Sequence, residues 1–131
     1  MNNKGLNIGL WVAQALVGAL MLTGGFMKLT TPIAELSKMM AWTGDFPEMI
    51  VRGLALLDIA GGVGIILPSL LKIKPNLTPL SAICIVFLMV AAITMHVSRG
   101  EVSVIGFNFV MIAMAGFVYW GRTKKVQILA K

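Results

Sequence analysis

The chain carries no charged residue between Lys4 and Lys28. An apolar run of this length crosses a bilayer as one helix, because about 20 residues at about 1.5 Å each span the hydrocarbon core. A cleavable signal peptide is the competing interpretation, but its apolar core is normally about 7–15 residues long. The whole chain is 58% hydrophobic and 12% charged, with a mean hydropathy of +0.91. A soluble domain of this size could not bury so much apolar surface, so we predict a small integral membrane protein that retains this run as a membrane helix.

Three later stretches are also mainly apolar and long enough to cross a bilayer. The predicted membrane spans are residues 6–29, 50–71, 76–97 and 102–121. The second and third connections are short, which makes neighbouring helices antiparallel. The predicted fold is therefore all-α, a transmembrane four-helix bundle in a single domain of residues 1–131. The longer first connection predicts a short amphipathic external helix between spans 1 and 2, on the membrane surface or as a lid. Its apolar residues recur at helical spacing: Ile33, Leu36, Met39 and Met40.

The charged residues predict the orientation in the membrane. Four crossings place both termini and the second connection on one side, whose charges are all basic: Lys4, Lys72, Lys74, Arg122, Lys124, Lys125 and Lys131. The other side mixes both signs: Lys28, Lys38, Arg52, Arg99, Glu35, Asp45, Glu48 and Glu101. By the positive-inside rule, both termini are cytoplasmic. The basic residues sit at helix ends and in the C-terminal tail without interleaved aromatics, so we expect anionic membrane lipids as their partners and no nucleic acid.

Asp58 is an acidic residue within an apolar, glycine-rich span. An ionised carboxylate in hydrocarbon costs about 2.5–3.5 kcal/mol on insertion scales, so such a residue faces the bundle interior, finds a partner or holds a proton. Gly61 and Gly62 lie three and four residues further on and share its helical face, where they permit close helix approach. The partner of Asp58 must come from another helix, with Lys28 and His96 as the best candidates, or the carboxyl is protonated.

Other polar residues converge on the same region from the external side. Asp58 and Asn108 both lie roughly 9–10 Å below the external ends of their spans, at about 1.5 Å per residue. We expect an intramembrane pocket that opens outwards and serves ligand binding or proton handling. Its predicted residues are Lys28, Arg52, Asp58, His96, Glu101 and Asn108.

Simpler roles compete for several of these residues. Lys28, Arg52 and Arg99 can snorkel to headgroups from helix ends, and for Arg99 we expect this rather than a site role. His96 near a boundary is either an interfacial histidine or a titrating one. Gln14 and Asn108 can act as interhelical hydrogen bonds of about 0.6 kcal/mol each, which we favour for Gln14.

The remaining candidates for chemistry narrow the function. Cys84 is the single cysteine, lies within a span and is expected to be an inert buried thiol. It excludes an internal disulfide and a Cys-x-x-Cys pair. One histidine argues against a haem held between two histidines of the same chain. We predict no catalytic residue, no metal site and no covalently bound cofactor, and we expect Trp42 and Trp120 to anchor at the interface.

Several short segments occur in order along nearly the whole chain: GGFMKL at 24–29, WTGDFP at 42–47, VR at 51–52, DIAGG at 58–62, ILP at 66–68, LTPL at 77–80, HVSRGE at 96–101, and Asn108. In this order they resemble the DoxX-like membrane proteins. The resemblance implies a four-helix, multi-pass protein of the bacterial inner membrane. Some members of the wider family are membrane subunits of sulfur or quinone redox enzymes, such as thiosulfate:quinone oxidoreductase. Others accompany quinone-detoxification proteins, and distant relatives assist receptor assembly.

Three functions follow as hypotheses. The first is an accessory subunit of a redox system, whose pocket binds a quinone-like or other small lipophilic molecule, or docks a redox enzyme subunit that supplies the electrons. The second is a small proton-coupled transporter, although no inverted repeat is evident. The third is a non-catalytic assembly factor or chaperone. We favour the first, in the form of a membrane subunit rather than a self-sufficient enzyme, with a homo-oligomer as a further possibility.

Overall fold

The computed structural model describes residues 4–129. Four helices are long and apolar enough to cross a membrane: α1 (Lys4–Thr30), α3 (Glu48–Leu71), α4 (Leu77–Ser98) and α5 (Ile105–Trp120), which a π-helical turn, η3 (Gly121–Lys125), continues. They confirm the predicted all-α bundle of four spans. The fourth membrane-spanning helix, α5, begins at Ile105 rather than at residue 102, because Val102–Val104 form a 3-10 turn, η2.

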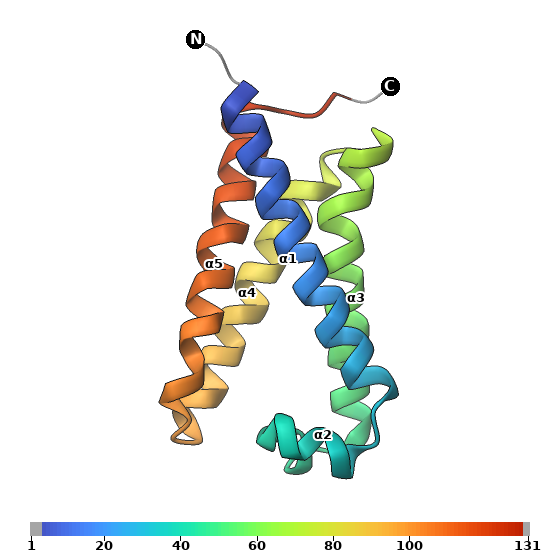
Figure 1. The fold of residues 1–131 in the computed structure, drawn as a ribbon, viewed down its shortest axis with the longest axis vertical. Helices are drawn as coiled ribbons and strands as arrows, with labels where there is room; N and C mark the ends of the chain where they lie inside the picture. The colour runs from blue at the N-terminus through green and yellow to red at the C-terminus, as the bar shows by residue number, and fades with distance from the viewer. Residues whose placement is uncertain (1–3, 130–131) are drawn as a thin grey trace.

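The bundle has two distinct ends (Figure 1). The described parts of both chain termini and the α3–α4 connection lie at one end, called here the terminal end. The short helix α2 (Ile33–Met39) and the α4–α5 connection lie at the other, called the α2 end. Figure 1 shows α1 and α3 diverging from α4 and α5 towards the α2 end.

Glycines hold α1 and α3 together along their length. A Cβ atom added at Gly25 would lie 2.9 Å from the carbonyl oxygen of Ala55, and one at Gly62 would lie 3.0 Å from that of Gly18. Since backbone atoms cannot move aside cheaply, only glycine permits this approach. The predicted close packing on the glycine face of Asp58 is confirmed at Gly62.

Outside this contact, the core is a column of apolar side chains from all four spans, including Val17, Ile65, Ile85 and Met111. The outer surface of the bundle is apolar as well, which suits contact with lipid. The predicted burial of Cys84 is wrong: its side chain is exposed. The buried face of α4 runs through Ala82, Ile85 and Met89, and Cys84 points away from that face.

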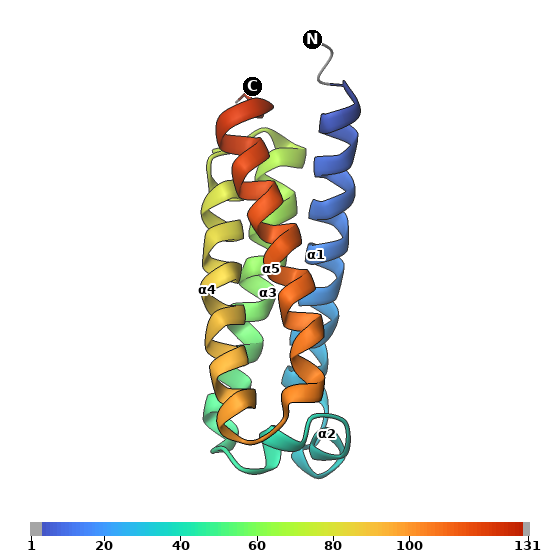
Figure 2. The ribbon, with the colours of Figure 1, turned by 90° about the vertical axis from the view of Figure 1, so that its left-hand side faces the viewer.

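The predicted amphipathic helix between spans 1 and 2 is present as α2, followed by a 3-10 turn, η1 (Ala41–Gly44). Figure 2 shows that this segment crosses the open end of the bundle. Leu36, Trp42 and Val51 form a second small core that fixes it to α3. The expectation that Trp42 anchors at the membrane interface is wrong, because the ring is packed inside the protein and is only 8% exposed.

At the terminal end, Gln14 and Arg122 form a buried polar connection. The amide nitrogen of Gln14 donates to the carbonyl oxygen of Ile65 at 2.7 Å, and its amide oxygen accepts from Nε of Arg122 at 2.7 Å. The interhelical role predicted for Gln14 is confirmed. Arg122, which was predicted to lie exposed in the C-terminal tail, is instead turned into the bundle and is 4% exposed.

Candidate functional site

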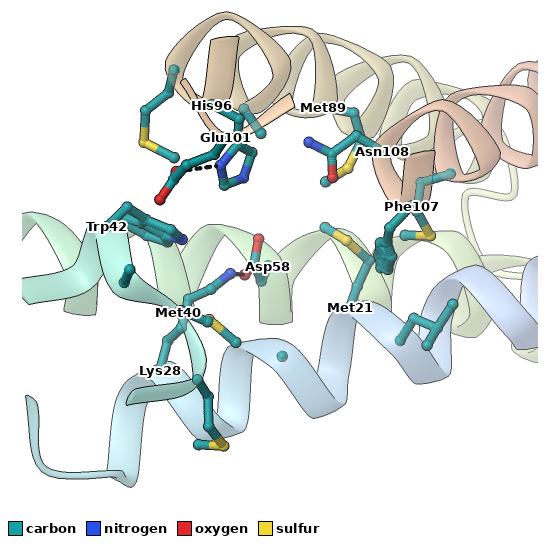
Figure 3. A pocket seen from close by; sticks show the side chains of 17 residues that line it. Met21, Lys28, Met40, Trp42, Asp58, Met89, His96, Glu101, Phe107 and Asn108 are labelled. Carbon is teal, nitrogen blue, oxygen red and sulfur yellow. Dashed lines mark hydrogen bonds and ion pairs between the residues drawn. The ribbon is translucent and has the colours of Figure 1, made fainter. Parts of the chain in front are cut away.

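A cavity of about 500 Å³ lies between the two helix pairs near the α2 end. Figure 3 shows its side chains, which come from α1, α3, α4, α5 and the segment containing α2 and η1. Five of the six predicted site residues line it: Lys28, Asp58, His96, Glu101 and Asn108. The remaining wall is mostly methionine, aromatic and small side chains, including Met21, Met40, Trp42, Met89, Phe107 and Met111.

Asp58 is paired with Lys28, one of the two partners that helical phase indicated. The Nζ atom of Lys28, at the end of α1, donates to a carboxylate oxygen of Asp58 in α3. Side-chain exposure is 17% for Lys28 and 6% for Asp58, so the pair is largely removed from solvent. The same Nζ lies 5.9 Å from the centre of the Trp42 ring, within the range of a cation–π contact. The ammonium group is therefore held between a carboxylate and an aromatic face at the cavity wall.

Arg52 does not line the cavity, in contrast to its predicted place among the pocket residues. Its Nη1 atom donates to the carbonyl oxygens of Lys28 at 2.5 Å and Thr31 at 2.8 Å, and its Nη2 atom lies 3.1 Å from a carboxylate oxygen of Glu48. The last carbonyls of a helix have no partner within the helix, and a cation there also complements the helix dipole. Arg52 therefore caps α1 and fixes the backbone of the residue that carries the ammonium group.

A second polar group joins the α4–α5 connection to the η1 segment. Glu101 accepts a hydrogen bond from Nε of Arg99 at 3.1 Å, and its carboxylate lies 3.0 Å from Nδ1 of His96. Arg99 also pairs with Asp45 at 2.6 Å. The hydrogen bonds with His96 and Arg99 lower the pKa of Glu101 below its ordinary value. The hydrogen bonds with Asp45 and Glu101 raise the pKa of Arg99. Arg99 thus has specific partners, which the snorkelling expectation did not include.

Asn108 provides an unused hydrogen-bond donor. Its side chain comes from α5, is 7% exposed and lines the cavity near Met89 and Phe107 (Figure 3). Its amide nitrogen is buried and has no hydrogen-bond partner. A buried polar group without a partner costs on the order of 1–3 kcal/mol, and such a group indicates a missing ligand or water. The amide nitrogen of Asn108 therefore makes no interhelical hydrogen bond.

The cavity wall includes residues that the sequence did not single out as site residues. These are mainly Met40, which precedes η1, Trp42 of η1, and Met89 and Met95 of α4. The apolar stripe of residues 33–40 was a usable signal for the first two, since a lid must place apolar groups over the bundle. Methionine is unbranched and polarisable and adapts to varied ligand shapes. Within residues 4–129, no three His, Cys, Asp or Glu side chains group together as metal ligands.

Chemically, the cavity can hold a small molecule that is mostly apolar and carries polar atoms at one end or edge. Lys28 and Asn108 supply donors, Asp58 and Glu101 supply acceptors, and the imidazole of His96 can act as either. These groups face one another across a mainly apolar space, as the labelled side chains in Figure 3 show.

Comparison with curated proteins and with solved structures gives no match. A model of the DoxX-like family, in contrast, matches residues 12–118, which covers most of the chain and every residue of the cavity wall. The match agrees with four helices that are suited to crossing a membrane. This chain is therefore a multi-pass membrane protein that belongs to the DoxX-like family.

Proposed function

We propose that the cavity binds a small lipophilic molecule with carbonyl or hydroxyl oxygens, of the quinone class, and that the protein serves as an accessory subunit of a membrane redox system. The observation that carries the proposal is the buried amide nitrogen of Asn108, which has no partner and belongs to the wall of a cavity of about 500 Å³. Ligand sites are typically clefts of about 300–1,000 Å³, mainly apolar with a few convergent polar groups.

Both the apolar and the polar side chains of the cavity wall suit this class of ligand. Methionines and aromatic rings from α1, α4, α5 and the η1 segment suit an apolar ring and its substituents: Met21, Met40, Trp42, Met89, Phe107 and Met111. A quinone presents two carbonyl oxygens that require donors. Asn108 can donate to one of them, and Lys28 carries a positive charge that favours an electron-rich oxygen.

Redox conversion of a quinone also moves protons, and the cavity contains groups able to exchange them. The His96–Glu101 pair reaches from the cavity wall to the exposed α4–α5 connection, so it offers a proton path to solvent. The electrons would come from a partner redox subunit that docks on the protein. The chain's own contribution would be to hold the ligand and exchange its protons.

The proposed location is the bacterial inner membrane with both termini cytoplasmic, so that the cavity opens to the outer side. The supporting observation is the charge distribution. Lysines gather at the terminal end, whereas the α2 end carries both signs. Reactivity of cysteines introduced at Lys38 and Lys124 towards a membrane-impermeant maleimide tests this orientation, with Cys84 replaced by alanine in both variants.

The decisive experiment for ligand binding has two steps. The protein is first purified with its native lipids, and mass spectrometry identifies co-purified quinone, lipid and protein together. Decylubiquinone binding is then titrated for the wild type and for Asn108→Leu, Asp58→Asn and His96→Ala. Asn108→Leu keeps the branched shape of the side chain but removes the donor, so we expect binding to weaken by about fivefold or more, the value of one hydrogen bond.

Cys84→Ala is the matched control, because Cys84 points away from the buried face of α4 and lies outside the cavity wall. Its affinity should equal that of the wild type. Unchanged quinone binding in all three cavity variants would overturn the proposal. Proton-coupled uptake in liposomes that is lost in Asp58→Asn would favour the transporter. A lower folded yield or partner recovery without altered binding would favour the assembly factor.

A further inference from the structure

Arg122 is a buried cation at the terminal end, far from the cavity described above. All the hydrogen bonds it donates go to neutral oxygens. Nε donates to Gln14 at 2.7 Å, and Nη1 donates to the side chain of Asn7 at 2.8 Å and the carbonyl oxygen of Val126 at 3.0 Å. The guanidinium also lies 5.4 Å from the centre of the Trp11 ring. Its Nη2 atom is buried and has no hydrogen-bond partner.

No side-chain carboxylate can neutralise this charge. The chain has five acidic residues, and all of them belong to α2, the η1–α3 segment, the first half of α3 or the α4–α5 connection. These are Glu35, Asp45, Glu48, Asp58 and Glu101, at or towards the opposite end of the bundle. Burying a charge without a counter-ion is costly, and buried charges in proteins are normally paired. Among the side chains of residues 4–129, none therefore supplies a counter-ion for Arg122.

Arg122 is one of the residues that line a cavity of about 290 Å³ at the terminal end. Arg122, Asn76, Thr123 and Gln127 contribute its polar wall, and two prolines and an isoleucine contribute the rest. Lys124 and Lys125 lie two and three residues after Arg122 and are exposed. The wall of this cavity is formed by the start of α4 and by the segment that follows α5, and the end of a bilayer-spanning helix is where phospholipid headgroups are expected.

We propose that Arg122 and this cavity form a binding site for a phosphate oxyanion, supplied by the headgroup of an anionic phospholipid or by free phosphate. The planar guanidinium suits phosphate oxygens, and its unpartnered Nη2 atom is the donor available to them. Asn76, Thr123 and Gln127 add polar atoms around the anion. The site is independent of the quinone proposal, because it shares no wall residue with the first cavity.

Native mass spectrometry of the detergent-purified full chain tests the site with three probes. These are phosphatidylglycerol, phosphatidylcholine with the same acyl chains, and inorganic phosphate. Phosphatidylglycerol should bind more tightly than phosphatidylcholine, and Arg122→Gln should weaken its binding by about tenfold, as expected for a charged hydrogen-bond donor. Lys124→Gln is the matched control, since it removes one exposed charge two residues away and should change the affinity by less than about twofold.

Because Arg122 also binds Gln14 and Asn7, its replacement can disturb folding, and a second variant keeps the test independent. Asn76→Leu narrows the cavity, and the side chain of Asn76 makes no capping hydrogen bond that would be lost. It should weaken phosphatidylglycerol binding while leaving the circular dichroism spectrum unchanged. Binding of inorganic phosphate that requires Arg122 supports the site with free phosphate as its source. Equal binding of the two lipids without phosphate binding, equal losses in Arg122→Gln and Lys124→Gln, or full affinity in Asn76→Leu would overturn the proposal.

Discussion

The Lys28–Asp58 pair allows a quantitative test of how the bundle is held together. The pair joins α1 to α3 beside the cavity, and both side chains are largely buried. Removing one partner of a buried ion pair typically costs about 3–5 kcal/mol, because the other charge is left unpaired. We expect about 3 kcal/mol for Lys28→Met, at the lower end of that range, since a buried carboxylate can be neutralised by a proton.

The two single variants should differ. Asp58→Asn leaves an ammonium group on a flexible stem in the last turn of α1, from which it can reach the interface. Lys28→Met leaves a carboxylate in the interior of α3, where the short side chain cannot move to water. Asp58→Asn should therefore cost about 1–2 kcal/mol, less than Lys28→Met, because its remaining charge can be solvated. The double variant should recover about 1–3 kcal/mol relative to the sum of the single variants.

Unfolding by sodium dodecyl sulfate in mixed micelles, followed by circular dichroism, gives the four unfolding free energies that the cycle requires: those of the wild type, the two single variants and the double variant. The chain contains its own reference pair, Lys38 and Glu35 of α2, whose side chains are 72% and 62% exposed at a distance of 3.5 Å. An exposed pair of this kind couples by only about 0.3–0.5 kcal/mol. A Lys28–Asp58 coupling energy no larger than that of the reference pair would refute the reasoning.

Three further predictions concern packing, pH and exposure. Gly62→Ala should destabilise the protein by about 1–3 kcal/mol, because the new Cβ would lie 2.8 Å from Leu22 and 3.0 Å from the backbone of Gly18. Gly53→Ala is the control in the same unfolding assay, because a Cβ at Gly53 meets nothing within 4 Å. Equal effects of the two substitutions would contradict this packing. Since the pKa of Glu101 is lowered in the folded protein, its contribution to stability should be complete above its ordinary value of 4.5 and fall as pH drops through the lower folded value. Hydrogen exchange of the α4–α5 connection should detect this loss, and Glu101→Gln should remove the dependence. Cys84 should react with a lipid-soluble maleimide in membranes without unfolding, and protection until denaturant is added would show that it is buried.

Hydropathy and helical phase predicted the fold and one central contact. Four long apolar runs predicted four spans, and the apolar stripe of residues 33–40 predicted α2. The acid in the second span required a partner from another helix, and Lys28 at the end of the first span was one of two candidates. These predictions succeeded because each depends on a single segment and on the high free energy of an unpaired charge in hydrocarbon.

The errors have a shared physical origin. A membrane helix is apolar on the side facing lipid as well as on the side facing its neighbours, so its sequence does not mark the buried face. Cys84 was misplaced for this reason, since most residues of its span are apolar. Arg52 and Arg122 were misplaced because, in addition to the pair that Arg52 forms with Glu48, backbone carbonyls and neutral amides position them. Such acceptors carry no charge pattern in the sequence, and only the packing of distant segments brings them within reach.

The Asp45–Arg99 ion pair gives the cavity an asymmetric closure. The segment of α2 and η1, which covers one end of the cavity, is joined to α1 and α3 by short chain segments. Arg52 also donates hydrogen bonds to two carbonyl oxygens at the end of α1. Towards α4 and α5, Asp45 and Arg99 make a partly exposed ionic contact. We therefore expect the contact with Arg99 to open more readily than the connections to α1 and α3, because mobile ions weaken partly exposed ion pairs. Ligand entry should accordingly be faster in concentrated salt. The affinity of the ligand should change little, because it depends on the side chains of the cavity wall.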